Sequence, residues 1–171
     1  MTHALRHFLD RWRLCAVLAA AGMLAAAHAF ETFGGYAPCM LCLRQREAYW
    51  VALALGAAFM MLVRAPGGPR WREATCWVLG LVFLVGAGIA AFHAGVEWKF
   101  WPGPEACAVT SGGVSAGDLS AFLDGAPVKA PACDEAVWVF AGLSMAGWNA
   151  VASLGLAILS VLAALRERSK R

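Results

Sequence analysis

The chain has 171 residues, of which 61% are hydrophobic and only 15% are charged, and its mean hydropathy is +0.63. Soluble domains contain about 45–50% apolar and about 25% charged residues. This composition therefore excludes an ordinary soluble fold and predicts an integral membrane protein. The formal net charge of +3 gives no reason to expect a nucleic-acid partner, because the basic residues gather in short segments beside the apolar stretches.

Four apolar stretches are long enough to cross a membrane, which takes about 20 residues in a helix. In chain order they cover residues 14–30, 43–63, 76–94 and 143–165. A long polar segment, residues 95–142, separates the last two. The sequence therefore predicts a single domain over residues 1–171 with an all-α membrane fold, a four-helix transmembrane bundle with a long loop between helices 3 and 4.

The basic residues predict the orientation of this bundle. Lysine and arginine in short loops and tails are retained on the cytoplasmic side of a membrane. Most of the 14 basic residues lie in three such places, before the first span, between the second and third, and after the fourth. We therefore expect both termini in the cytoplasm, and we expect residues 95–142 and the Cys39–Cys42 end of the second span on the opposite side.

The long loop carries two further signals. Trp98, Trp101 and Trp138 flank it, as is typical of aromatic rings anchored at the depth of the lipid headgroups. Within it, an S-x-x-D start signal and one apolar face over residues 115–123 predict a short helix lying on the membrane surface. A solvated loop rich in turns is the alternative for this segment.

The N-terminal segment also allows two interpretations. Basic residues at positions 6–13, an apolar run and the sequence Ala27-His28-Ala29 have the form of a secretory signal peptide with a small-residue cleavage site. Cleavage after Ala29 would leave three spans without changing the side on which any later loop lies. We favour retention, because the charged region is long and the bundle without this helix is thin.

The six cysteines divide by compartment. Cys15 and Cys76 lie at cytoplasmic ends of spans, where thiols are kept reduced, and we expect them to act as small buried hydrophobes. Four others lie on the oxidising side: Cys39, Cys42, Cys107 and Cys133. Four thiols permit three pairings, and local geometry favours Cys39 with Cys42, which leaves Cys107 with Cys133.

The C-x-x-C motif stands at the start of the second predicted helix. Pro38 suits the first helical position, and the positive end of the helix dipole, together with Arg44 and Arg46, is expected to stabilise a thiolate. A stabilised thiolate is a better leaving group in disulfide exchange. Because the loop that this motif would close is too short to stabilise the fold much, the spacing favours a redox role over a structural one.

Three other chemistries use similar residues. Attachment of c-type haem needs C-x-x-C-H, but Leu43 follows the motif. A four-cysteine zinc site usually uses two close pairs, whereas Cys107 and Cys133 are far apart in sequence. Axial ligation of a b-type haem would need His28 and His93, near the outer ends of the first and third spans. All three are less favoured than disulfide chemistry.

The chain carries Y-x-P-C-x-L-C-x-x-x-R over residues 36–46 and a histidine at the end of the third span. An aromatic-Pro-x-Pro element precedes Cys107, and Cys133-Asp134 precedes Trp138 and Leu143-Ser144-Met145. This ordered set resembles the disulfide bond formation protein B (DsbB) family. The likeness runs from about residue 13 to the end of the fourth span, and its specificity rests on the order of four cysteines in a four-span frame.

The resemblance implies a quinone-dependent thiol oxidase in a bacterial inner membrane, with the long loop in the periplasm. In that family a reduced periplasmic thioredoxin-fold protein, DsbA, attacks the loop disulfide at the cysteine that matches Cys107. Cys133 then takes part in passing the electrons to the Cys39–Cys42 pair. By its position Cys42 would form the thiolate complex with bound quinone, and the residues do not distinguish ubiquinone from menaquinone.

The same resemblance gives roles to two residues that are not cysteines. Arg46 matches the family's quinone-associated arginine, and His93 stands where the family has a histidine in its third span. An arginine at this depth can also simply extend to lipid phosphate, and a histidine at a helix end can simply bond a backbone carbonyl. Both alternatives stay open at the level of sequence.

A second hypothesis belongs to another class of protein. The chain could be a tetraspan structural or interaction protein with two stabilising extracytoplasmic disulfides. That hypothesis predicts bridges that resist mild reductant and membranes that need no quinone, whereas the oxidase predicts labile disulfides and quinone-dependent turnover.

Overall fold

The structure, a computed structural model, describes residues 3–62, 68–104 and 132–170. Cys107 and the predicted surface helix at 115–123 lie outside these residues. The described chain forms five helices and one short antiparallel hairpin: α1 (His3–Asp10), α2 (Trp12–Gly34), α3 (Met40–Leu62), α4 (Gly68–Glu97), β1 (Val139–Phe140), β2 (Leu143–Ser144) and α7 (Met145–Arg168).

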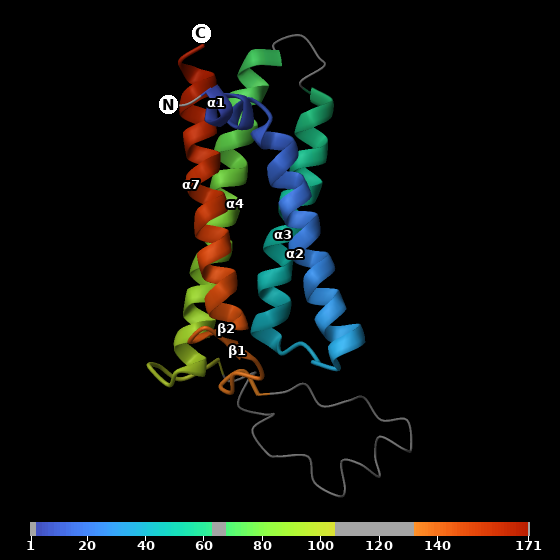
Figure 1. Ribbon diagram of the computed structural model, residues 1–171, viewed down its shortest axis with the longest axis vertical. Helices are drawn as coiled ribbons and strands as arrows, with labels where there is room; N and C mark the ends of the chain where they lie inside the picture. Colours follow the sequence, from blue (N-terminus) through green and yellow to red (C-terminus); the bar gives the residue numbers. More distant parts are fainter. Residues whose placement is uncertain (1–2, 63–67, 105–131, 171) are drawn as a thin grey trace, which may run out of the picture.

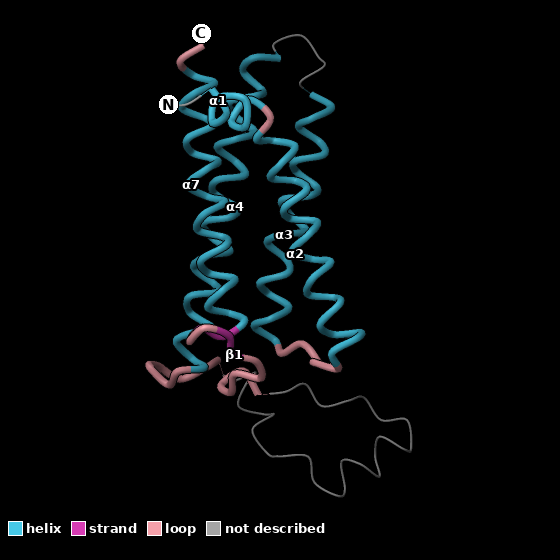
Figure 2. The backbone as a smooth tube through the Cα atoms, viewed as in Figure 1, coloured by secondary structure: helices cyan, strands magenta, loops and turns pink. Residues whose placement is uncertain are grey.

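Four long helices make up most of the molecule. Figure 1 shows α2, α3, α4 and α7 running along its longest axis, with both chain ends at the same end of the bundle. Helices α4 and α7 make the most extensive contact, followed by α3 with α4 and α2 with α3. The opposite end holds the loops that enter α3 and α7 and the small hairpin, as the tube in Figure 2 makes plain. The C-x-x-C motif therefore lies at the end of the bundle away from both termini.

Three of the described helices are long and apolar enough to cross a membrane, namely α2, residues 70–97 of α4, and α7. They contain the predicted stretches 14–30 and 76–94 and nearly all of 143–165. The remaining stretch, 43–63, forms most of α3, but α3 is not among the three candidate spans. A polar run from Arg44 to Glu47 occupies its first two turns and lowers its apolar content. The four-span bundle is thus supported for three helices and stays a prediction for α3.

The core of the bundle is built largely from small side chains. Ala16 and Ala20 of α2, Ala52 of α3 and Ala163 of α7 are completely buried, which allows the helix backbones to approach closely. Near the chain termini, the indole nitrogen of α2 residue Trp12 donates a 2.8 Å hydrogen bond to Ser160 of α7.

The two cysteines predicted to be structural lie in or against this core. Cys76 is 1% exposed, and Cys15 packs against the same cluster. Both are free thiols. Their positions fit the predicted role of small hydrophobic residues.

A charged cluster closes the end of the bundle where the termini meet. Asp10 of α1 accepts a hydrogen bond from Arg166 Nε at 2.8 Å and another from Lys170 Nζ at 2.6 Å. These two cations, Arg166 first, hold the pKa of the Asp10 carboxyl well below its usual range. The cluster ties the N-terminal helix to the end of α7.

At the other end of the bundle, the chain leaves α4 in a tight turn. Lys99 takes a left-handed conformation with φ of 61°, and Trp101 folds back to stack on Phe92 and to donate a 3.0 Å hydrogen bond to its carbonyl oxygen. A Cβ atom on Gly95 would lie 2.0 Å from the Trp101 ring. Only glycine therefore leaves room for the indole in this position.

The short hairpin sets the entry into α7. Ala141 and Gly142 both have positive φ, 49° and 79°, as a two-residue type I′ turn between paired strands requires. The hairpin ends at Ser144, whose hydroxyl caps α7 by accepting a 3.1 Å hydrogen bond from the backbone of Gly147. Ser144 is completely buried, so the start of α7 is fixed directly beside the cysteine motif.

Candidate redox site

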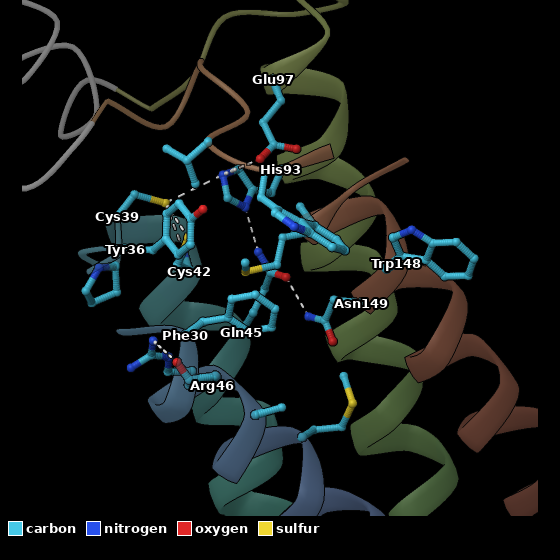
Figure 3. A pocket seen from close by; sticks show the side chains of 18 of the residues that line it. Phe30, Tyr36, Cys39, Cys42, Gln45, Arg46, His93, Glu97, Trp148 and Asn149 are labelled. Carbon is cyan, nitrogen blue, oxygen red and sulfur yellow. Dashed lines mark hydrogen bonds and ion pairs between the residues drawn. The ribbon is translucent and has the colours of Figure 1, made fainter. Parts of the chain in front are cut away.

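A largely apolar cavity of about 450 Å³ lies at the end of the bundle away from the termini. Side chains of α2, α3, α4 and α7 and of the segment before β1 line it, and Figure 3 shows its polar members. Four of the site residues predicted from the sequence line this cavity: Cys39, Cys42, Arg46 and His93. Other lining residues are Phe30, Gln45, Glu97, Trp148 and Asn149.

The two cysteines of the motif lie in direct contact. Cys39 Sγ is 2.8 Å from Cys42 Sγ, longer than the roughly 2.05 Å of a disulfide bond, and both are free thiols. The Cys39 thiol donates toward the Cys42 sulfur. This contact first, and burial second, raise the pKa of Cys39. Cys42 is therefore the member of the pair whose negative charge its neighbour stabilises.

The start of α3 differs from the sequence-based expectation. Pro38 was predicted at the first helical position, but α3 begins at Met40. Cys39 instead occupies the position just before the helix, where its sulfur accepts a 3.2 Å hydrogen bond from the backbone nitrogen of Cys42. A serine or aspartate commonly fills this capping role, and here the thiol takes it. Cys42, in the first turn, still benefits from the positive end of the helix dipole.

Cys133 belongs to the same buried cluster as the motif. Cys39, Leu41, Val96 and Cys133 form this cluster, and Cys42 packs against it. Cys133 is 1% exposed and is disulfide-bonded. Its predicted partner, Cys107, lies outside the described part of the chain. Three of the four cysteines predicted to react are thus gathered in one place, although more than 90 residues separate Cys42 from Cys133 in sequence.

His93, in the last part of α4, faces the motif. Its side chain is buried, and Nε2 lies 3.5 Å from Cys39 Sγ. Its other nitrogen, Nδ1, lies 2.6 Å from the amide nitrogen of Gln45, and the ring also hydrogen-bonds the backbone of Cys133. His93 therefore touches a cysteine of the motif and the backbone of the loop cysteine at once, which is more than a histidine that merely bonds a carbonyl at a helix end.

A hydrogen-bonded chain of side chains leads from His93 into the bundle. The Gln45 carbonyl oxygen accepts from the Asn149 amide, whose own oxygen accepts from the Tyr49 hydroxyl. Asn149 of α7 thus makes two hydrogen bonds to α3. Figure 3 shows the His93–Gln45–Asn149 part of this chain spanning α4, α3 and α7.

A buried carboxylate completes the surroundings of His93. Glu97 is one turn further along α4, its side chain is 6% exposed, and its Oε1 lies 3.8 Å from His93 Nε2. Its other oxygen accepts a hydrogen bond from the hydroxyl of Ser144, the cap of α7. Glu97 is not among the site residues predicted from the sequence. An i, i+4 spacing from His93 on one helix is the signal that could have found it.

Arg46 of α3 lines the cavity and is bonded to two groups of α2. Its Nη1 is 2.6 Å from Glu31 Oε2, its Nη2 donates to the carbonyl of Ala27 at 3.2 Å, and its side chain is 14% exposed. It does not extend freely outward. Arg44, by contrast, forms an exposed 3.1 Å ion pair with Glu47. The two arginines of the motif therefore have different surroundings, and only Arg46 lines the cavity.

The same residues also have the chemistry of a metal site. One ligand atom each from Cys39, Cys42 and His93 lies within 4.8 Å of the others. A disulfide between the two cysteines removes both thiolate ligands, so metal binding and disulfide formation exclude each other here. His28, the other residue considered for haem ligation, instead pairs with Glu31 at 3.7 Å.

The family model of "Disulfide bond formation protein DsbB" matches residues 10–163 of the chain. This chain belongs to the DsbB family. Its relatives include a disulfide bond formation protein B of Marinobacter nauticus, which is 32% identical over 95% of this chain and 96% of its own. No solved structure gives a significant match.

Two further DsbB relatives agree. The disulfide bond formation protein B of Methylococcus capsulatus is 33% identical over 87% of this chain and 90% of its own. That of Xanthomonas campestris pv. campestris is 33% identical over 92% and 91%. The family resemblance expected from the cysteine pattern is confirmed, and the chain is a DsbB-type membrane disulfide bond formation protein with oxidoreductase chemistry.

Proposed function

We propose that this DsbB family member reoxidises a periplasmic thioredoxin-fold dithiol oxidase of the DsbA type and passes the electrons to membrane quinone. The observation that carries this proposal is the single buried cluster that holds Cys39 and Cys133, with Cys42 packed against it, at the wall of an apolar cavity. A loop cysteine that packs against the motif pair can exchange disulfides with it, and the cavity beside them can admit an apolar electron acceptor.

The electrons would move through two exchanges and one oxidation. A thiolate of the reduced partner attacks a disulfide between Cys107 and Cys133. The second partner thiolate releases the mixed disulfide, so the partner leaves oxidised and the loop pair is reduced. The loop dithiol then reduces a Cys39–Cys42 disulfide in the same way. Each exchange breaks one sulfur–sulfur bond and forms another, and two electrons and two protons move forward each time.

The final acceptor needs a high potential. DsbA has a reduction potential of roughly −120 mV, against a glutathione poise near −180 to −210 mV even in the oxidising endoplasmic reticulum, and about 30 mV corresponds to 1.4 kcal/mol for two electrons. A glutathione buffer therefore cannot oxidise it efficiently. Quinone supplies this chemistry when bound, because it takes up two electrons and two protons to become a quinol.

The cavity fits such a group. Its volume of about 450 Å³ lies within the roughly 300–1,000 Å³ typical of small-molecule sites, and its surface is mainly apolar. Cys42 lines it on α3, and Trp148 lines it on α7. Arg46 would hold the oxygen of the ring through its guanidinium, where fixed positive charge stabilises developing negative charge.

The proposed orientation follows from the charges and the arrangement of the helices. We infer a multi-pass protein of the bacterial inner membrane, in which α3 crosses the membrane together with α2, α4 and α7 and both termini are cytoplasmic. Support comes from the basic residues of the terminal cluster, Arg166 and Lys170, and from the placement of the cysteine cluster at the far end of the bundle. Labelling of single cysteines introduced at residues 3 and 170 with a membrane-impermeant reagent tests this orientation.

A reconstituted assay tests the function. Purified protein, ubiquinone or menaquinone and a reduced thioredoxin-fold partner are mixed, and partner oxidation is followed. The parent is expected to turn over only with quinone. Cys42→Ser is expected to abolish turnover, whereas Cys15→Ser, a thiol in the core away from the site, should keep the parental rate. Quinone-dependent turnover by Cys42→Ser at the parental rate would contradict the proposal and favour a purely structural role for the cysteines.

A further inference from the structure

The direction of the hydrogen bonds that lead to His93 can be worked out from one fixed point. The amide nitrogen of Gln45 lies 3.4 Å from the carbonyl oxygen of Leu41 and 2.6 Å from His93 Nδ1. A carbonyl oxygen only accepts hydrogen bonds. The end of the Gln45 amide that faces Leu41 and His93 must therefore be the NH₂ group, and each of its two hydrogens has an acceptor.

The directions of the other hydrogen bonds follow from this assignment of the Gln45 amide. Because the Gln45 nitrogen faces His93, the Gln45 oxygen faces Asn149. Asn149 must therefore donate to it through its amide nitrogen. Asn149 then turns its own oxygen to Tyr49, and the tyrosine hydroxyl donates. The Tyr49 hydroxyl, the Asn149 amide and the Gln45 amide each donate to the next group. These hydrogen bonds therefore run in one direction, from Tyr49 toward His93.

This direction decides which nitrogen of His93 carries the hydrogen. Because Nδ1 accepts from Gln45, the neutral ring must be protonated at Nε2. Nε2 is the nitrogen that faces the motif, 3.5 Å from Cys39 Sγ. His93 is thus a hydrogen-bond donor to Cys39 and is not placed to take the proton of its thiol.

A second acceptor for the same N–H lies close by. Glu97 Oε1 is 3.8 Å from His93 Nε2. The Ser144 oxygen already accepts from the Gly147 backbone, so its single hydrogen is free to go to Glu97 Oε2. Ser144 therefore holds Glu97 as an acceptor beside the ring. The ring also hydrogen-bonds the Cys133 backbone, so the donor lies beside that backbone and beside two side chains that can each accept its hydrogen.

We propose that Gln45 and Asn149 are positioning residues that hold His93 as an Nε2–H donor, and that this donor turns to Cys39 when the reduced pair holds a thiolate at Cys42 and to Glu97 when the Cys39–Cys42 disulfide has formed. The inference rests on the proposed function, because it assigns a redox cycle to this pair. A Cys39 thiol that donates to the Cys42 thiolate is a better acceptor than a disulfide sulfur, since hydrogen bonds in a chain polarise and strengthen one another. The arrangement stabilises the reduced pair and keeps the hydrogen satisfied after oxidation.

Nitrogen NMR of the full-length protein in detergent, labelled with ¹⁵N-histidine, tests the tautomer directly. The chain has four histidines, and His93→Gln assigns the resonance of interest. The parent is expected to show His93 protonated at Nε2. A neutral ring protonated at Nδ1 in the parent would overturn the inference, whatever the activity assays show.

Two variants separate positioning from simple packing. Gln45→Glu keeps the size of the side chain but offers Nδ1 an acceptor, so we expect it to place a hydrogen on Nδ1. Ser153→Ala removes a hydroxyl whose oxygen lies 2.8 Å from the Tyr49 oxygen. It leaves the hydrogen bond from Gln45 to the Leu41 carbonyl in place, so the tautomer should stay as in the parent. An unchanged Nδ1 in a folded Gln45→Glu protein would contradict the role given to Gln45.

The redox part of the proposal has its own measurement, which needs neither quinone nor partner. The Nε2–H proton shift is expected to differ between the chemically reduced and oxidised parent, and the difference should shrink in Glu97→Gln, which replaces the charged acceptor. Equal shifts in both redox forms of the parent would overturn the turning of the donor. If the shifts behave as expected but reconstituted turnover fails, the proposed function is wrong and the assignment of the hydrogen bonds stands.

Discussion

Arg46 and Glu31 form a 2.6 Å ion pair that joins α3 to α2 at the wall of the cavity. The pair fixes the guanidinium in place, because Arg46 also donates to the carbonyl of Ala27. A cation held in advance at the position where negative charge develops costs little reorganisation during the reaction. In the proposed function, this geometry suits Arg46 to binding quinone better than a freely extended arginine would be.

Arg46→Gln is therefore expected to weaken quinone binding. Hydrogen bonds to charged groups contribute about 1.5–3 kcal/mol, and about 1.4 kcal/mol corresponds to a tenfold change, so KM for quinone should rise roughly 10- to 100-fold. Exchange between the partner and the loop disulfide in a single turnover should not change. Steady-state kinetics at varied quinone concentration measures both.

Arg44→Gln is the matched control for that prediction. Arg44 is two residues away, has the same charge and pairs with Glu47 on the exposed surface, where ion pairs contribute about 0–1 kcal/mol. Its replacement should leave KM for quinone unchanged. If both variants raised KM equally, the effect would come from the overall charge of this end of the bundle and not from the position of Arg46.

Gly95 and Gly88, two glycines of α4, should respond in opposite ways to a methyl group. A Cβ on Gly95 would lie 2.0 Å from Trp101, whereas a Cβ on Gly88 has nothing within 4 Å. Gly95→Ala must displace the indole and is expected to destabilise the protein by about 1–3 kcal/mol. Gly88→Ala should be neutral or stabilising by up to about 1 kcal/mol, because alanine favours helix. Thermal unfolding in detergent gives both values, and equal shifts in Tm would argue against the packing of Trp101 described above.

The cluster around Asp10 predicts a specific pH dependence. Arg166 and Lys170 lower the pKa of Asp10 in the folded state, so this carboxylate adds stability above its unfolded pKa of about 3.9. That stability is lost as the pH falls through the folded value. Asp10→Asn should destabilise the protein by up to about 1 kcal/mol at pH 7, and the difference from the parent should vanish as the pH falls well below 3.9. A difference that persists in acid would mean that Asp10 acts through packing instead of charge.

The helices could be predicted from the sequence because each depends on local composition. Apolar stretches of about 20 residues and the cysteine motif at a polar boundary were enough to place both ends of α2 and α7 within four residues. The end of α4 was placed within three residues, but α4 begins eight residues before the predicted span. The stretch 43–63 forms most of α3, but α3 is not among the candidate spans, because the polar residues 44–47 that build the site also dilute its apolar character. The start of α3 was predicted wrongly for a local reason. Met40 and not Pro38 is the first helical residue, because Cys39 caps the helix.

The site was only partly predictable, since its contacts depend on how the helices are rotated and packed. The hydrogen bond between Asn149 and Gln45 follows only from the packing of α7 against α3. Glu31 was missed because its pairing with Arg46 joins two helices and leaves no pattern within one segment. Glu97 follows His93 by one turn of α4, a spacing that could have found it. The proximity of Cys133 to Cys39 was expected from the resemblance alone, and nothing in the local sequence would have given it.

The most direct test of the account is the order in which the cysteines accept electrons. Oxidised protein without quinone is mixed anaerobically with a reduced thioredoxin-fold partner, quenched at intervals in acid, alkylated and mapped by mass spectrometry. The account predicts reduced Cys107 and Cys133 first, then reduced Cys39 and Cys42, and reoxidation of all four when quinone is added. If Cys39 and Cys42 remain oxidised while the partner is consumed, or if quinone fails to restore the disulfides, the proposed path from the loop to the membrane is wrong.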